Sequence, residues 1–390
     1  MNIAFLSQGK LFVRREEGEC TEIISAFGRE VINRSIKIQQ ANEWKTQKSG
    51  TPFSGSQLWG VSGTDMRAAK VAVSGMSRGG ESGEIFYLLE MDTTGGLFSH
   101  DLRSGAEKRL FHRQNFRARD LDWNEQHRLL TCSQSFDNGT ANIIITNDEG
   151  RESRQLTEGD SVDEAPSWAR GGGKKIVFQS AGVARNANGY YQGLGPFAIQ
   201  ELDLERQTLR TLVENEGYDH LLPHMKADST LYYIRRPYEM MGRKPLSFFE
   251  FLKDFLLVPF RLLRSLFHFL DFFSRTFSQK PLTTATGPKT GGDDEQKIEL
   301  RGRMIDAKNA RERDAMKNHD VSLVPDSWEL IERIPSGDTR VLAKGVVSFD
   351  LAEDGTLIHT DGRRVYQIDS QGKSQRLFKE QLIQEVGCIG

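Results

Sequence analysis

Residues 75–79, Gly-Met-Ser-Arg-Gly, match the Gly-x-Ser-x-Gly pattern that presents the nucleophilic serine of many hydrolases. Such a serine is exposed for attack where a strand turns sharply into a helix. Here a glycine- and serine-rich stretch, 80–83, leads into residues 84–89, which have the apolar character of a second strand. The pattern therefore predicts a hairpin turn near Ser77. Because the sequence also offers no strand–helix–strand region for a hydrolase domain, we expect no catalytic residue and no enzyme.

Asp219, His220 and His224 stand close together, and two imidazoles with a carboxylate could bind zinc. No third strong ligand is indicated, and the alternative is that these are ordinary polar groups of a turn. The sequence also lacks a Walker loop, a dinucleotide fingerprint after a strand and a calcium loop. We therefore expect neither a metal nor a cofactor.

Acidic residues stand at the beginning of several apolar runs. They are Asp120, Asp122, Asp160, Asp163, Glu164, Glu214, Glu216, Asp219 and Asp350. Carboxylates that converge on one place would suit a basic segment of a partner, whereas carboxylates on separate turns would only be solvated. Whether these carboxylates form one site or lie on separate turns depends on the strands and turns that carry them.

Those elements repeat along the chain. In residues 164–178, Pro166 and Trp168 are followed by three glycines and then by an apolar run, which predicts two strands joined by a tight turn. Similar stretches occupy residues 120–130, 222–234 and 348–358. Each unit also has a second strand–turn–strand signature, as at 143–157 and 365–378. One unit thus offers four short strands, which is typical of a propeller blade.

On these repeats the chain resembles the TolB-like, WD-repeat-like six-bladed β-propellers, whose repeats carry Pro-x-Trp-Ser-Pro-Asp-Gly-Lys before an apolar strand. Residues 166–171 keep the proline and tryptophan but lack the second proline and the aspartate, and residues 352–355 keep Asp-Gly. The resemblance implies a scaffold that serves sensors, adaptors and enzyme modules alike. It also implies that a segment of a partner protein is received at a mouth of the axial channel.

We therefore expect an all-β fold, a six-bladed β-propeller. Residues 3–24 supply three strands of the first blade, and residues 382–389 remain after the last blade is complete. Pairing of the N- and C-terminal strands is expected to close the ring and remove exposed sheet edges. The other blades are expected at 69–111, 117–157, 162–213, 221–235 with 328–343, and 346–378. The chain is thus divided into propeller residues 1–238, an insertion in blade 5 at 239–327, and propeller residues 328–390.

Three stretches do not have blade character. Residues 28–66 are longer and more polar than a blade connection needs, and we expect a loop-rich insertion there. Residues 282–296 have the composition of a linker. Residues 304–318 combine alanine with alternating charges, which predicts a solvated helix.

The insertion begins with an amphipathic segment, because residues 248–277 hold ten of the chain's 23 phenylalanines. On a wheel of about 100° per residue, its charges fall within an arc of roughly 120° and the remaining arc is apolar. Pro259 predicts a kink or two helical halves. The candidate contact residues are Phe248, Phe251, Leu252, Phe255, Leu256, Phe260, Leu263, Phe267, Leu270 and Phe273, with Arg261 and Arg264 on the charged side.

This apolar arc is wider than the stripe of about 100° that a helix on its own domain needs, so something else should cover it. Charges interrupt the segment too often for a membrane span. Residues 235–280 carry nine basic and four acidic side chains, a local charge of +5, which favours contact of residues 245–280 with a membrane surface. A protein partner, a second copy and burial against the propeller are the alternatives.

In a propeller, the innermost strands would bring acidic residues to a shared channel mouth. Our candidates for binding a partner protein there are Asp120, Asp122, Asp163, Glu164, Asp219 and His220. The formal charge of −2 argues against a nucleic-acid partner. Three widely spaced cysteines suggest neither a disulfide framework nor a zinc site. The N-terminus lacks signal-peptide character, so we expect a cytoplasmic protein, peripheral at the membrane if the helix meets lipid.

These expectations favour a non-enzymatic interaction scaffold that docks to a membrane surface or a partner through its amphipathic insertion. The alternatives are an adaptor whose insertion mediates contact with another protein or a second copy, and a hydrolase that depends on Ser77.

Overall fold

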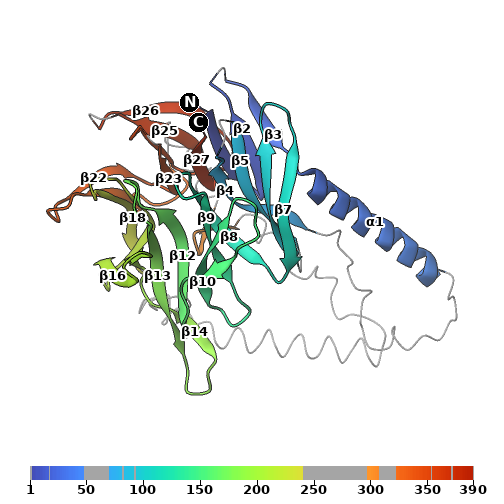
Figure 1. Cartoon of the computed structure of the whole chain (residues 1–390), viewed down its shortest axis with the longest axis horizontal. Coiled ribbons are helices and arrows are strands. Elements are labelled where there is room, and N and C mark those ends of the chain that lie inside the picture. The colour runs from blue at the N-terminus through green and yellow to red at the C-terminus, as the bar shows by residue number, and fades with distance from the viewer. Residues whose placement is uncertain are drawn as a thin grey trace, which may run out of the picture.

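The computed structural model describes residues 2–16, 18–47, 70–80, 83–91, 94–239, 297–306, 322–352, 354–369 and 372–389. The amphipathic segment 248–277, with all its candidate contact residues, and the linker 282–296 lie outside these ranges. Within them, the strands are arranged as sheets around a common centre (Figure 1). None of the helices in the described ranges has the length and apolar character needed to cross a bilayer.

The first sheet joins the two ends of the chain. It consists of β27 (Glu385–Ile389), β1 (Asn2–Ser7), β2 (Lys10–Arg14) and β3 (Cys20–Ile23), in that order. β1 and β27 are antiparallel, with Asn2 opposite Ile389 and Leu6 opposite Glu385. This pairing confirms the predicted closure of the fold by its terminal strands.

Two further four-stranded sheets follow the chain order. The second contains β4 (Val71–Arg78), β5 (Glu84–Met91), β6 (Thr94–Asp101) and β7 (Glu107–Gln114). The sheet at the end of the chain contains β23 (Ser348–Leu351), β24 (Leu357–Thr360), β25 (Arg364–Ile368) and β26 (Ser374–Lys379).

A nine-stranded sheet consists of two units that meet at the single parallel pair Ala141 and Val162. One unit has β8 (Arg117–Asn124), β9 (Leu129–Ser135), β10 (Ala141–Asn147) and the short β11 (Arg154–Gln155). The other has β12 (Ser161–Trp168), β13 (Lys175–Arg185), β14 (Tyr191–Leu194), β15 (Ala198–Asp203) and β16 (Thr208–Val213).

The remaining four-stranded sheet is assembled from two distant parts of the chain. It contains β17 (Tyr218–Met225), β18 (Leu231–Pro237), β21 (Glu329–Arg333) and β22 (Thr339–Lys344). β18 pairs directly with β21, so the chain leaves this sheet after β18 and returns to it at β21. The chain between β18 and β21 therefore interrupts a single sheet.

The sheets pack face to face, and their middle strands are covered on both sides. In β5, Ile85 and Tyr87 join an apolar cluster with the first sheet, whereas Phe86 and Leu88 join a cluster with the unit that begins at β8. The rings of Phe86 and Trp123 lie 5.2 Å apart at this second interface. Burying each such side chain contributes about 1.5–3 kcal/mol, which explains why the middle strands are continuously apolar.

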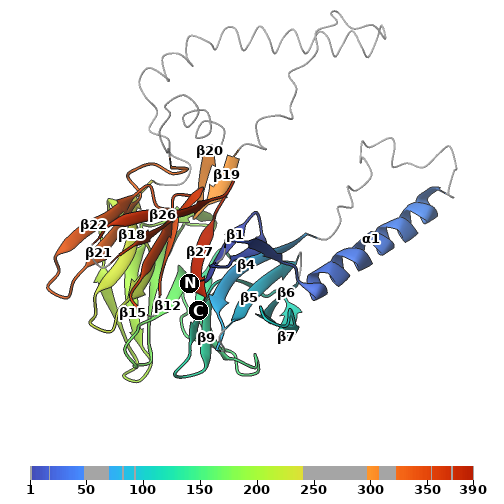
Figure 2. The same ribbon diagram turned by 90° about the horizontal axis from the view of Figure 1, so that it is seen from above.

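Two local predictions were wrong. α1 (Ala26–Gln47) occupies much of the region expected to be loop-rich, and it projects away from the sheets (Figures 1 and 2). Ser25 caps this helix by accepting a hydrogen bond from the amide of Gly28 at 3.0 Å. High polarity had suggested a loop, but Arg, Glu, Gln, Lys and Ala are good helix formers.

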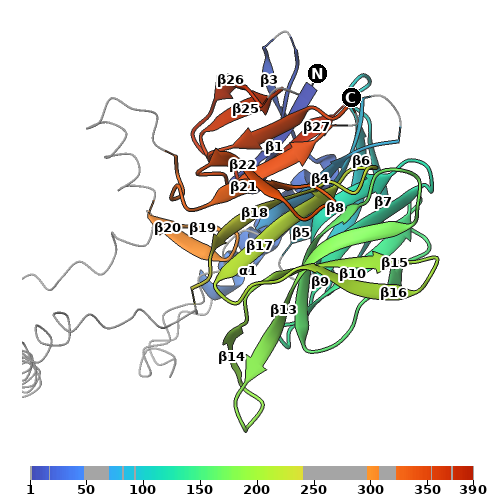
Figure 3. The same ribbon diagram turned by 90° about the vertical axis from the view of Figure 1, so that its left-hand side faces the viewer.

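The second error concerns the start of the predicted helix 304–318. Arg303–Asp306 form β20, which pairs with β19 (Lys297–Leu300) in a separate two-stranded hairpin. Residues 307–318 of the predicted helix lie outside the described ranges. The tight turn at residues 301 and 302 starts the second strand of the hairpin before a helix can begin. The hairpin lies at one end of the arrangement of sheets (Figures 2 and 3).

Candidate functional site

The innermost strands contact one another in the cyclic order β27, β4, β8, β12, β17, β23 and back to β27. They surround a cavity of about 350 Å³, which we call the channel cavity. Its lining includes five carboxylates and three guanidinium groups. These are Asp120, Asp122, Asp350, Asp354 and Glu385, with Arg78, Arg170 and Arg301.

A repeated bulge shapes the innermost strands. In β8, Arg119 is opposite Ser133 but Asp122 is opposite Thr131, so β8 contains one more residue than its partner. β12 and β17 have the same irregularity between residues 164 and 167 and between 221 and 224. A bulge bends a strand and re-aims its side chains. The repetition therefore turns corresponding residues of neighbouring strands toward the same space.

Each of these bulges holds a residue with a left-handed backbone: φ is 55° at Asp120, 50° at Ala165 and 54° at Leu222. Aspartate tolerates this conformation better than most residues. Ala165 and Leu222 each precede a proline, which disfavours the right-handed helical region for them. Neither residue type favours a positive φ, so at Ala165 and Leu222 the bulge imposes this backbone.

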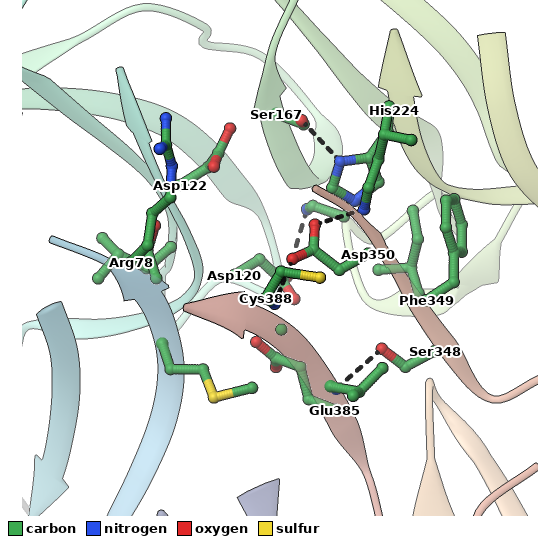
Figure 4. A pocket seen from close by; sticks show the side chains of 18 of the residues that line it. Arg78, Asp120, Asp122, Ser167, His224, Ser348, Phe349, Asp350, Glu385 and Cys388 are labelled. Carbon is green, nitrogen blue, oxygen red and sulfur yellow. Dashed lines mark hydrogen bonds between the residues drawn. The ribbon is translucent and has the colours of Figure 1, made fainter. Parts of the chain in front are cut away.

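One residue from each of four repeats lies in a ring around the cavity, and three of the four follow a bulge in β8, β12 or β17. Asp122, Ser167, His224 and Asp350 lie on four consecutive innermost strands, and Figure 4 shows their side chains around one space. The Ser167 hydroxyl lies 3.1 Å from Nδ1 of His224. Asp122 accepts a 2.7 Å hydrogen bond from the amide of Trp168, and Asp350 accepts one of 2.7 Å from the amide of Cys388. The two carboxylates therefore also tie neighbouring strands together.

At the mouth of the cavity, the tip of the β19–β20 hairpin introduces Arg301. Its Nη1 lies 3.0 Å from Oδ1 of Asp120, and its Nη2 lies 3.9 Å from Oε2 of Glu385. The other Asp120 oxygen accepts a 3.2 Å hydrogen bond from the amide of Ala165. One guanidinium is therefore shared between two carboxylates.

Enclosure changes the protonation of the carboxylates and the imidazole. Burial raises the pKa of Asp122 to about 6 and that of Glu385 to about 7, and the negative charge of Asp350 adds to both shifts. Burial also lowers the pKa of His224 to about 4. Burial therefore disfavours the charged form of acid and base alike, and a cation brought into the cavity would need direct contact with the carboxylates to offset its loss of hydration.

The chain around Ser77 does not have the strand-to-helix turn that exposes a hydrolase nucleophile. Residues 75–78 all lie in β4, and the amide of Gly79 donates to the carbonyl of Glu84 at 2.7 Å, so the chain around Ser77 passes from strand through a turn to strand. His224 beside Ser167 has a pKa near 4, which makes it a weak base at neutral pH.

The structure brings together some of the residues predicted for the channel mouth. Asp120 and Asp122 line the cavity. Glu164 lies nearby, 3.8 Å from Arg119, and burial raises its pKa. Asp163 is buried and accepts a 2.6 Å hydrogen bond from the Ser180 hydroxyl.

Asp219 and His220 belong to a different region, between β17, β18 and the hairpin. Asp219 pairs with Arg236 at 2.9 Å and with Arg303 at 3.4 Å. His220 is buried against Tyr233 with ring centroids 5.4 Å apart, and its Nδ1 lies 3.2 Å from the carbonyl oxygen of Phe197. Within the described ranges, no three His, Cys, Asp or Glu side chains are grouped so that they could hold a metal ion.

Sequence reasoning missed Glu385 and Arg301 as cavity residues. Glu385 could have been found, because residues 382–389 were already assigned to the closing innermost strand. The ring residues could also have been predicted from the sequence, because Asp122, Ser167 and His224 occupy the same position of the repeat. Each stands one residue before a large apolar side chain, namely Trp123, Trp168 and Met225. Nothing local marked Arg301, which stands between a linker-like stretch and a charged one.

The sequence matches no family model and no curated protein. Among solved structures, it is similar to TolB from Acinetobacter baumannii, with a TM-score of 0.50 and 9% identity over 99% of this chain and 66% of that chain. A chain of a nidogen/laminin complex is also similar, with a TM-score of 0.50 and 9% identity over 99% of this chain and 97% of that one. The chain therefore has a TolB-like β-propeller fold.

Proposed function

We propose that this propeller is a non-enzymatic interaction protein whose channel cavity receives a short basic segment of a partner protein. The observation that carries this proposal is the charge of the cavity, where five carboxylates face three guanidinium groups. Proteins of similar fold give general support, since one of them is part of a nidogen/laminin complex. A cation from a partner would offset the excess of carboxylates, and it would do so more strongly here than in bulk water.

The lining of the cavity suits an extended segment or the tip of a loop. Arg78 is the last residue of β4 and Asp354 follows β23, whereas Arg301 meets Glu385 at the first residue of β27. Charged groups thus line the cavity near both the beginnings and the ends of the innermost strands. Phe349 and Leu351 add apolar lining, so a side chain with an apolar stem and a cationic end fits its chemistry.

The experiment begins with the tagged full chain, from which bound proteins are identified and one is purified. Its affinity is then measured for the wild type and for the isosteric variant Asp122→Asn/Asp354→Asn, which removes two negative charges from the cavity. We expect binding to weaken about tenfold or more. A matched control, Asp137→Asn, removes a charge from an exposed ion pair with Arg117 and should bind normally. Equal affinity of all three proteins would rule out the cavity as the binding site.

A second docking surface is proposed on sequence grounds alone. The apolar arc of residues 248–273 and the local charge of +5 favour a membrane surface, and a protein partner or a second copy is the alternative. With three cysteines free of disulfides, we place this contact in the cytoplasm. Co-sedimentation with anionic liposomes should require residues 248–277. If deletion of the segment changes the oligomeric state but not sedimentation, the contact is between proteins.

A further inference from the structure

The β19–β20 hairpin ends in a turn with an unusual residue at its tip. Arg301 has φ of 48° and Gly302 has φ of 73°, so both central residues of the two-residue turn have a positive φ. Turns of this kind favour asparagine, aspartate or glycine at both positions. The turn itself does not favour arginine, so the contacts of its side chain are the better explanation for its presence.

The side chain of Arg301 reaches the mouth of the channel cavity, where Asp120 and Glu385 meet it from β8 and β27 at 3.0 and 3.9 Å. The guanidinium side chain is only 19% exposed. The backbone of the same residue is also held, because Arg236 donates a 2.8 Å hydrogen bond to its carbonyl oxygen. The tip is therefore fixed by contacts to the propeller.

Beyond its tip, the hairpin is joined to the propeller by side-chain contacts and not by backbone pairing, and Arg303 also pairs with Glu239 and donates to the carbonyl oxygen of Pro237. Among the described strands, β19 and β20 pair only with each other. A two-stranded hairpin alone is marginally stable in water, so this one depends on its docking. Leu300 is its apolar anchor, buried in the cluster around Trp328, and Arg303 is a second charged anchor at Asp219. Removal of the hairpin would break no backbone ladder of the sheets described above.

We propose that the mouth of the channel cavity is a guanidinium-binding site, that Arg301 is its internal occupant, and that a partner presenting an arginine on a tight turn enters by displacing the β19–β20 hairpin. The inference deepens the proposed function and rests on it, since the arginine belongs to the partner segment. Two carboxylates on separate strands match the forked donors of arginine better than a lysine ammonium. Because Arg301 of this chain occupies the site, we expect the partner to present the same guanidinium group.

The test uses the full chain and a fluorescent peptide with the sequence of residues 297–306. The variant Leu300→Ala/Arg301→Ala removes the apolar anchor and the guanidinium of the internal hairpin. We expect the peptide to bind this variant about tenfold or more tightly than the wild type. A matched peptide with alanine in place of Arg301 should bind neither protein. Asp120→Asn/Glu385→Gln, added to the variant, should abolish peptide binding.

Equal peptide affinity for wild type and variant, or equal binding of the two peptides, would overturn the proposal. If the variant does not fold, hydrogen exchange of the wild type gives a second measurement. Excess peptide should then accelerate exchange of the hairpin amides while the β1–β27 amides remain protected. Hairpin amides that stay as protected as those of β1 at every peptide concentration would show a permanent structural plug instead.

The outcomes separate this inference from the proposed function. If the peptide binds as expected but Asp122→Asn/Asp354→Asn loses no partner, the guanidinium site stands and the proposed role of the rest of the cavity is wrong. If that variant loses its partner but the peptide never binds, the cavity binds proteins without displacing the hairpin.

Discussion

Two clusters hold the β19–β20 hairpin in place, and their charges are balanced in opposite ways. At Asp219, one buried carboxylate faces two guanidinium groups, those of Arg236 and Arg303, and the exposed carboxylate of Glu239 pairs with Arg303 from outside at 3.1 Å. At the channel mouth, the single guanidinium of Arg301 is shared by Asp120 and Glu385. The first cluster is a closed structural ion pair, whereas the second has more acceptors than its one cation satisfies.

The protonation of the two clusters reflects this difference. Burial lowers the pKa of Arg236 to about 10, but the guanidinium remains charged at neutral pH beside Asp219. At the mouth, burial raises the pKa of Glu385 to about 7 because Arg301 offsets only part of the cost. The comparison indicates that a buried acid with its own cation serves stability. A buried acid that must share a cation is the better candidate for contact with a ligand, as we propose for Glu385.

The strongest test of this comparison is Asp219→Asn. The substitution keeps the shape but leaves Arg236, whose side chain is 5% exposed, without its carboxylate. We expect a loss of about 3 kcal/mol in the free energy of unfolding, measured by urea denaturation. Asp137→Asn, at an exposed ion pair with Arg117, is the control and should leave stability nearly unchanged. A small loss at Asp219 would remove the distinction between the clusters.

Glu385→Gln should increase the free energy of unfolding at alkaline pH, whereas Asp219→Asn decreases it. In the unfolded chain this carboxyl ionises near pH 4.5, whereas in the folded protein it keeps its proton until about pH 7. The folded state therefore binds more protons in this window, and stability falls as pH rises through it. The amide cannot ionise, so the variant should gain up to about 3 kcal/mol over wild type from pH 4.5 to pH 8. A pH-independent difference between the two urea midpoints would contradict this.

Arg301→Ala should have a smaller effect on stability than Asp219→Asn, because its side chain is 19% exposed and Glu385, whose pKa is raised to about 7, can keep its proton instead. We expect a loss of about 1–2 kcal/mol at neutral pH, which increases as the pH rises. Arg301→Lys keeps the charge without the forked donors and should lie between the alanine variant and the wild type. A loss that decreases with rising pH would show that Arg301 does not offset these carboxylates.

The smallest expected effect is that of Ser77→Ala, a change without charge in the lining of the cavity. Stability should change by less than about 0.5 kcal/mol. Hydrolysis of small ester substrates by the purified protein should be the same for variant and wild type, at the level of the buffer alone. An activity that disappears in the variant would instead revive the hydrolase hypothesis.

The strands themselves were predictable because their signals are local. Apolar runs such as 176–178 and 231–234 became buried strands, and the surplus strand near the C-terminus pairs with β1 as expected. α1 was missed because its polarity was taken for a loop, although its helix formers and the capping Ser25 were visible in the sequence.

The site was predictable only in part. Asp120 and Asp122 were identified because they begin a repeat, but Asp219 shares that position and lies in an ion pair outside the cavity. The difference depends on Arg236 and Arg303, which come from another strand and from the hairpin. No spacing within a repeat can show which distant cation will reach a given carboxylate.

By itself, the amino-acid sequence determined the repeating strands and the closure of the fold through its two ends, because short-range alternation, turn residues and apolar runs set strand formation. Only the tertiary structure decided which acids face the channel and that Arg301 is held among them. A one-residue bulge re-aims a side chain, and the partner of a buried charge is chosen by packing between segments far apart in the chain.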